Sequence, residues 1–308
     1  MVIKRSGIHT VRVFGIEMSA GYGFTVPLLL FFLVILYPLA RVVFLALFDV
    51  SFLNPEMREF VGFGNFAAML SAEARFLPAV GRSVLWVAGS VFLKVLIGLV
   101  LALLLNTGLR GRSFYRALSI IPWGIPWAIA AMMWGWTLNS QYGFINAILM
   151  QTGFLEGPFS FLTRPGVAFG SLMVVDAWIG IPFMVIILEA GLKSIPKQLY
   201  ESAWVDGAGS VAQFFHITLP MLKKVLVTGT LLSTVWTFNS FDPIWILTGG
   251  GPLRTTETLP IAIYNTGFRM VAGGNLGLAA AMTVGQVILV SFIAVFYIRA
   301  LKEDWRDA

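Results

Sequence analysis

Long apolar segments alternate with short polar segments along most of this 308-residue chain. Six of the apolar segments are long enough to cross the roughly 30 Å hydrocarbon core of a bilayer as helices. The pattern therefore predicts an all-α integral membrane protein with six transmembrane helices, near residues 24–48, 84–105, 117–138, 167–189, 225–247 and 276–298.

The composition agrees with a membrane protein, since 58% of the residues are hydrophobic and 12% are charged. A water-soluble core does not absorb this much apolar surface. The chain has no cysteine and two histidines, His9 and His216, which lie far apart in the sequence. We therefore expect no disulfide, no metal site and no cofactor within this chain.

The basic residues recur between the apolar segments instead of forming one stripe, which argues against nucleic acid as a partner. With a cytoplasmic amino terminus, thirteen Lys and Arg residues fall inside and six outside, with Arg41 and Lys94 within spans. This bias predicts that both termini are cytoplasmic. We expect a basic arm on the inner surface over residues 1–22, a transmembrane domain over 23–300 and a cytoplasmic tail over 301–308. Lys94 is expected to face other helices or water.

Residues 198–220 are more polar and richer in small residues than the segments around them. The pattern predicts a short helix, a break at Gly207 and a second short helix that ends at Pro220. This loop spans residues 191–224, between the fourth and fifth helices on the predicted cytoplasmic side. Its small residues would let the surface of a partner approach the backbone.

Nine positions of this loop resemble the EAA loop of the membrane subunits of binding-protein-dependent ABC importers. They are Glu201, Ala203, Asp206, Gly207, Ala208, Phe214, Ile217, Leu219 and Pro220. Ser202 stands where the family usually has alanine, which exchanges one small residue for another. The resemblance implies that the loop couples the subunit to an ATPase through Glu201, Ser202, Ala203, Asp206, Gly207, Ala208 and Phe214. The alternative is an amphipathic surface helix that only covers the membrane face.

Two further segments resemble carbohydrate importers. Gly62, Asn65 and Phe66 match a stretch that precedes the second span in sugar-type subunits. Residues 248–252 resemble the external loop of the first permease subunit. The glycines of this loop are not part of a GxxxxGK[ST] pattern, so we expect no nucleotide binding there.

The fourth span carries Asp176, Gly180 and Phe183 on one helical face. An aspartate inside a membrane helix is a functional candidate, because an unpaired charge there is costly. The substrate hypothesis competes with a hydrogen bond between helices that has no role in binding.

The fifth span carries Ser233, Trp236, Thr237 and Ser240 on one face, with Asn239 beside them. Hydroxyl groups next to an aromatic ring suit a neutral, hydroxyl-rich ligand, although the same groups also join helices. Four tryptophans of the third span, at positions 123, 127, 134 and 136, are more typical of anchors at the headgroup level than of a sugar site.

The resemblance implies a first-type permease subunit of a carbohydrate ABC importer in a bacterial inner membrane. It also implies a set of partners: a second homologous permease, two ATPase subunits that hold ATP and magnesium, an extracytoplasmic solute-binding protein, the carbohydrate and membrane lipid. The sequence shows no catalytic residues, so we expect a transport subunit and not an enzyme. Glycerol phosphate or an amino acid as the solute, and an ion-driven secondary transporter, remain open.

Overall fold

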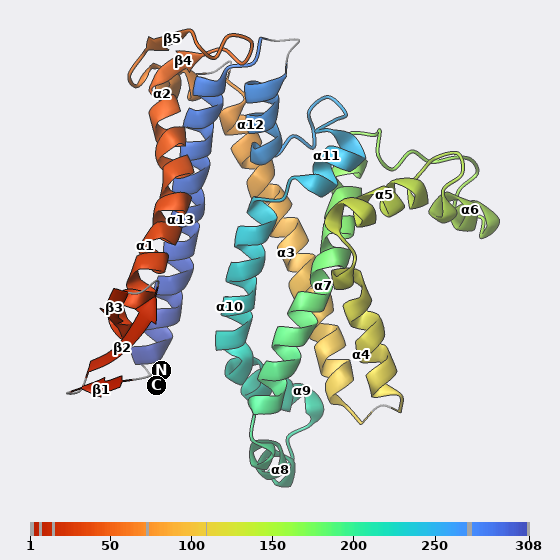
Figure 1. Cartoon of the computed structure of the whole chain (residues 1–308). Helices are drawn as coiled ribbons and strands as arrows, with labels where there is room; N and C mark the ends of the chain where they lie inside the picture. The colour runs from red at the N-terminus through yellow and green to blue at the C-terminus, as the bar shows by residue number, and fades with distance from the viewer. Residues whose placement is uncertain are drawn as a thin grey trace. The chain divides into compact units, whose positions relative to one another are not determined.

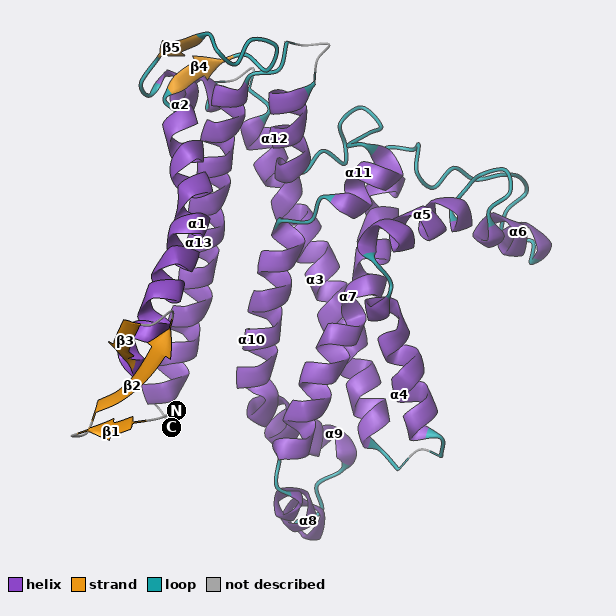
Figure 2. Ribbon diagram, viewed as in Figure 1, coloured by secondary structure: helices purple, strands orange, loops and turns teal. Residues whose placement is uncertain are grey.

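The computed structural model describes residues 3–5, 8–13, 16–71, 74–108, 110–269 and 273–306. Most of these residues are helical (Figures 1 and 2). The chain divides into two compact units. The first consists of Met1–Met69 and Thr266–Val284, and the second of Leu70–Asn265 and Gly285–Ala308.

The first unit begins with strands where the sequence predicts only a basic arm. Isoleucine, valine and threonine are frequent in this segment, and β-branched residues favour extended backbone. Three strands pair in antiparallel order β1-β2-β3, and a second sheet pairs β4 with β5. The all-α prediction therefore misses two small sheets. The elements are β1 (Ile3–Arg5), β2 (Ile8–Val13), β3 (Ile16–Ser19), α1 (Ala20–Leu45), β4 (Phe48–Val50), β5 (Arg58–Phe60) and α2 (Gly64–Met69).

Asn65 explains the stretch that the sequence singles out before the second span. Its side chain is buried at the start of α2. The amide nitrogen Nδ2 donates to the Ala46 carbonyl at 3.0 Å and to the Phe48 carbonyl at 2.8 Å. These two carbonyls lie where α1 ends and β4 begins, so the asparagine fixes this turn.

We expect Asn65→Ala to lower the free energy of unfolding of the protein by about 1–3 kcal/mol, the cost of leaving buried polar groups unpaired. The midpoint of thermal unfolding of the purified protein measures the loss. Asn54, an exposed residue of the same unit, provides the control. Its replacement by alanine should change the midpoint little. Equal midpoints for the two variants would contradict the role of Asn65.

The second unit is built on three long helices that lie side by side (Figure 1): α3 (Phe76–Asn106), α7 (Val167–Ser194) and α10 (Leu219–Phe238). Ala102 of α3 meets Met184 and Leu188 of α7 and Leu222 of α10 in one buried cluster. Many other leucine, valine and phenylalanine side chains on these helices are exposed. An apolar surface of this kind suits lipid as its surroundings.

Shorter elements connect the three helices and complete the unit. α12 and α13 each contribute residues to both units. The connecting elements are α4 (Arg112–Ile120), the 3-10 helix η1 (Ile121–Gly124), α5 (Trp127–Thr137), α6 (Phe144–Gln151), α8 (Lys197–Val205), α9 (Ser210–Gln213), the π-helix η2 (Phe214–Thr218) and α11 (Asp242–Thr248). The last two helices are α12 (Leu259–Phe268) and α13 (Leu276–Arg306).

Four helices within the described residues are long and apolar enough to cross a membrane: Pro27–Leu45, Phe76–Asn106, Val167–Ser194 and Leu276–Arg299. The predicted span at 117–138 is instead two helical segments bent by 101°, which make a fifth span if they count as one. Pro122 and Pro126 lie at this bend, as expected for residues that interrupt helical hydrogen bonding. The predicted span at 225–247 divides between α10 and α11.

Candidate functional site

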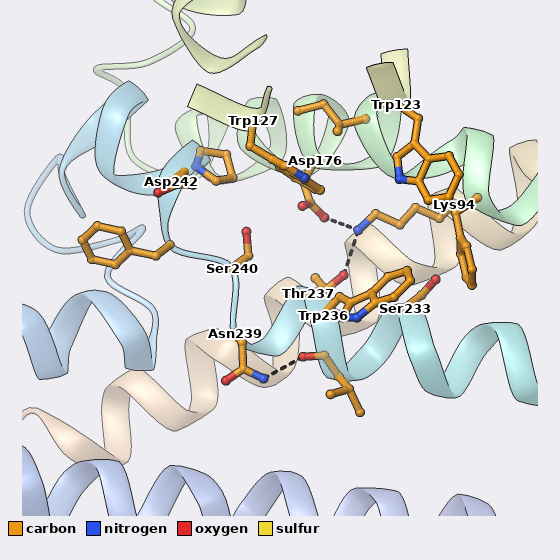
Figure 3. Close-up of a pocket in the computed structure, with 16 residues that line it drawn as sticks. Lys94, Trp123, Trp127, Asp176, Ser233, Trp236, Thr237, Asn239, Ser240 and Asp242 are labelled. Carbon is orange, nitrogen blue, oxygen red and sulfur yellow. Dashed lines mark hydrogen bonds and ion pairs between the residues drawn. The ribbon is translucent and has the colours of Figure 1, made fainter. Parts of the chain in front are cut away.

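The second unit contains a cavity of about 510 Å³ among α3, α7, α10 and the bend before α5 (Figure 3). Every residue that the sequence predicts to contact a solute lies in its lining. The fourth span supplies Asp176, Gly180 and Phe183. The fifth span supplies Ser233, Trp236, Thr237, Asn239 and Ser240. The helical spacing of the two faces therefore predicts which residues the fold brings together.

A buried ion pair crosses the cavity. Lys94 Nζ of α3 lies 2.6 Å from Asp176 Oδ2 of α7 and donates a hydrogen bond of 2.7 Å to Thr237 Oγ1 of α10 (Figure 3). Lys94 is 4% exposed and Asp176 is fully buried. One ammonium group thus joins all three long helices of the unit.

Aromatic rings line one side of the same cavity. The rings of Trp123 and Phe183 have centroids 6.4 Å apart, and those of Phe183 and Trp236 have centroids 4.8 Å apart. About half of the surface of Trp123 and of Trp236 is exposed. Trp127 also lines the cavity, whereas Trp134 and Trp136 are not among its described lining residues. The third span therefore supplies two tryptophans to the lining of the cavity.

The remaining polar residues of the lining differ in how freely they face the cavity. Ser240 points into it (Figure 3). Ser233 Oγ lies 3.5 Å from the sulfur of Met184. Asn239 belongs to the lining, but its amide donates to the Val235 carbonyl at 2.8 Å and accepts a hydrogen bond from Gln286. Asn239 is therefore already bonded within the protein.

The loop between α7 and α10 forms the predicted helix, break and helix. Gly207 ends α8 in the left-handed region with φ of +81°. Its amide donates to the Trp204 carbonyl at 3.0 Å, and the Ala208 amide donates to the Ala203 carbonyl at 2.8 Å. This pair of bonds is a Schellman motif, which favours glycine at the position of Gly207.

The seven residues assigned to coupling differ in how exposed they are. Glu201, Ser202, Asp206 and Gly207 are exposed, and Ala203, Ala208 and Phe214 are half-buried. Trp204 and Val205, which the sequence interpretation does not include, are 76% and 79% exposed. The free end of α8 therefore presents a mixed acidic and apolar surface.

The loop is held to the long helices at its base. The Tyr200 hydroxyl and Thr218 Oγ1 share a hydrogen bond of 2.9 Å, and Gln213 Nε2 donates to the Ala208 carbonyl at 3.0 Å. Ile217 packs against the buried cluster of α3, α7 and α10. In contrast to the prediction, Pro220 does not end the second helix. It lies at the start of α10, within a helical segment that continues directly from the π-helix η2.

The cavity and the loop are connected by the same two helices. α7 leaves the cavity at Phe183 and ends at Ser194, a distance of about 17 Å at 1.5 Å per residue. α10 returns from the loop to the cavity, which its residues Ser233, Trp236 and Thr237 line. The two helices therefore connect this loop with two walls of the cavity (Figure 1).

Residues 94–306 match a family described as the inner membrane component of binding-protein-dependent transport systems. The chain belongs to this family. It is 36% identical over 285 residues to the trehalose/maltose transport system permease protein MalF of Thermococcus litoralis, with 92% of this chain and 94% of that protein covered. It is 35% identical over 245 residues to the sn-glycerol-3-phosphate transport system permease protein UgpA of Rhizobium meliloti, with 79% and 81% covered.

The fold of the permease is also similar to a solved chain of a bacterial ABC transporter involved in the import of the acidic polysaccharide alginate. The TM-score is 0.76 at 22% identity, and the match covers 92% of this chain and 94% of that chain. This likeness extends over both units.

The ion pair between Lys94 and Asp176 in this permease could not be predicted from the sequence. A lysine near the middle of a span indicates that some partner lies nearby, because an unpaired charge there is costly. The partner of Lys94 lies on another span, and local periodicity contains no information on which helices pack together. Its contact with Asp176 therefore required the tertiary structure.

Proposed function

We propose that this chain is one of two permease subunits of an ABC importer that translocates a carbohydrate or related polyol. The observation that carries the proposal is the cavity, whose lining combines an aromatic wall with hydroxyl and carboxylate groups. Aromatic faces suit the apolar face of a sugar ring, and the polar groups suit its hydroxyls. The relatives named for trehalose, maltose and sulfoquinovosyl glycerol support a carbohydrate as the solute.

The proposed assembly contains a second homologous permease, two ATPase subunits that hold ATP and magnesium, and an extracytoplasmic solute-binding protein. It lies in a bacterial inner membrane with both termini in the cytoplasm. In this arrangement the bent segment 112–137 and the helix α10 complete six spans with the four long apolar helices. The excess of Lys and Arg in alternate connections supports this orientation.

The proposed mechanism uses α8 as a lever. Glu201 and Asp206 bond to donors at the rim of a groove in the ATPase, while the exposed Trp204 and Val205 enter the groove. ATP binding closes the ATPase pair and moves α8. Because α7 and α10 continue from this loop to the cavity, the movement opens the cavity alternately to the two sides of the membrane.

Two other functions give different experimental results. Glycerol phosphate as the solute is favoured by the relative UgpA. An ion-driven secondary transporter would lose uptake with an ionophore and keep it when ATP is depleted.

The experiment is to reconstitute the chain with its co-encoded subunits in vesicles and to screen solutes for stimulation of ATP hydrolysis. A carbohydrate should stimulate hydrolysis, and stimulation by none of the sugars would contradict the proposal.

Trp236→Ala should weaken solute-stimulated ATP hydrolysis, with about a fivefold higher half-saturating concentration. This shift corresponds to about 1 kcal/mol for the loss of an aromatic contact. The expected loss follows from the exposed ring of Trp236 on the cavity wall. Trp136→Ala is the matched control, because Trp136 is 75% exposed and is not among the described lining residues. Equal effects of the two substitutions would show that Trp236 has no contact with the solute.

A further inference from the structure

The side chain of Lys94 packs directly over Gly180, which has no side chain of its own. A Cβ atom at position 180 would lie 2.7 Å from Lys94 Cδ and closer still to Lys94 Cε. Real Cβ atoms do not approach other atoms so closely, so an alanine at this position requires the lysine side chain to move. Gly180 therefore has a role besides solute contact, which is to let the lysine pass between α3 and α7.

The described lining of the cavity contains more acidic than basic side chains. Among the described lining residues Lys94 is the only cation, and Asp176 and Asp242 are the two acids. Asp176 cancels the charge of Lys94, because their charged atoms lie 2.6 Å apart. Asp242 is exposed at the edge of the cavity and leaves the lining with a net negative formal charge. An anionic solute entering this cavity would meet no unpaired cation in the lining.

The hydrogen-bonding capacity of the pair also favours an uncharged ligand. An ammonium group has three donors; Lys94 donates one hydrogen bond to Thr237 and forms an ion pair with Asp176 Oδ2. Asp176 Oδ1 is buried and has no hydrogen-bond partner among the described residues. A hydroxyl group both donates and accepts, so it satisfies the free donor and the free acceptor together. An ionised phosphate or carboxylate offers acceptors alone and leaves Asp176 Oδ1 unpaired.

We propose that the Lys94–Asp176 pair determines specificity, and that it makes the cavity select uncharged, hydroxyl-rich solutes over phosphorylated or carboxylated ones. Asp176 acts by cancelling the charge that would otherwise attract an anion. The inference rests on the proposed function, in which the cavity holds the solute. Family membership leaves this choice open, since relatives are named both for trehalose/maltose and for glycerol phosphate.

The test compares two probes that differ by one phosphate, trehalose and trehalose 6-phosphate. The permease is assembled with its co-encoded permease and ATPase subunits, and the solute-binding protein is omitted so that its own selectivity does not contribute. Quenching of tryptophan fluorescence reports binding, because Trp123, Trp127 and Trp236 line the cavity. The wild-type complex should bind trehalose about tenfold or more tightly than trehalose 6-phosphate, because like charges repel in a poorly screened site.

Asp176→Asn removes the negative charge and leaves Lys94 unpaired, so the preference should shift toward trehalose 6-phosphate by about tenfold or more. The double variant Lys94→Met/Asp176→Asn contains neither charge, so most of this shift should disappear. Gly180→Ala keeps both charges but displaces Lys94 from Asp176, and it should shift the preference in the same direction as Asp176→Asn. This variant tests the inference even where Asp176→Asn yields too little folded complex.

A preference that stays within about twofold of wild type in both Asp176→Asn and Gly180→Ala would overturn the inference, since a unit charge near the ligand has a larger effect. A wild-type complex that binds trehalose 6-phosphate more tightly, or that binds neither probe, would also overturn it. The two proposals fail separately. If sugars stimulate ATP hydrolysis while the preference is insensitive to the variants, the inference fails and the proposed function stands.

Discussion

Replacing Gly207 by valine is expected to reduce solute-stimulated ATP hydrolysis and uptake by at least about tenfold while the protein still inserts in the membrane. Gly207 has a φ of +81°, and the left-handed region costs L-residues about 1–2 kcal/mol, more for a β-branched side chain. Apart from its two chain neighbours, no described residue has an atom within 4 Å of a Cβ atom built at this position. The cost is therefore backbone strain, and the turn relieves it by changing the angle between α8 and α9.

In the proposed mechanism, that change of angle moves the exposed end of α8 away from the groove in the ATPase, so a local cost has a large effect on coupling. Uptake and ATP hydrolysis in reconstituted vesicles measure it. Gly207→Asn is the matched control, because asparagine adopts the left-handed conformation more readily than other residues with a side chain. It should retain most of the coupled activity. Full activity in the valine variant would show that the conformation at Gly207 does not matter for coupling.

The cavity could be predicted largely from the sequence, and the reason is geometric. Asp176, Gly180 and Phe183 share a helical face, as do Ser233, Trp236 and Thr237, and polar faces of membrane helices turn away from lipid. Two such faces on neighbouring spans therefore meet inside the protein, and the structure confirms that they line one cavity. Asn239 follows the same logic less well, because its amide is already bonded to Val235 and Gln286.

Boundaries of the helices were harder to predict than their faces. Pro220 is read as a helix end, yet the helical segment that starts at Ser210 continues through the π-helix Phe214–Thr218 into α10. The π-helical turn directly before Pro220 changes the hydrogen-bond register there, so this proline does not mark a helix end. Similarly, the apolar run at 225–247 contains a break after Phe238 that hydrophobicity alone does not mark. Strands β1–β3 were missed because a short basic segment with β-branched residues has no apolar face to identify it.

The ion pair also predicts a large effect on stability. Lys94→Met should lower the free energy of unfolding by about 3–5 kcal/mol, the usual cost of removing one partner of a buried pair. The methionine fills a similar volume, so the loss arises from Asp176, which stays fully buried with no counter-charge. The midpoint of thermal unfolding and the yield of monodisperse protein in detergent measure the effect. Asp176→Asn should be destabilising for the same reason, because it leaves Lys94 unpaired.

The double variant Lys94→Met/Asp176→Asn should be more stable than either single variant, because it buries no charge. Replacing both members of a buried pair is often neutral or even stabilising. The two single variants and the double variant form a thermodynamic cycle, and the coupling energy measured by this cycle is that of the pair. If the double variant were as unstable as the sum of the single ones, Lys94 and Asp176 would act independently, contrary to their 2.6 Å contact. Strong coupling would instead mean that the pair joins α3 to α7, so that the group that sets the charge of the cavity also holds its walls together.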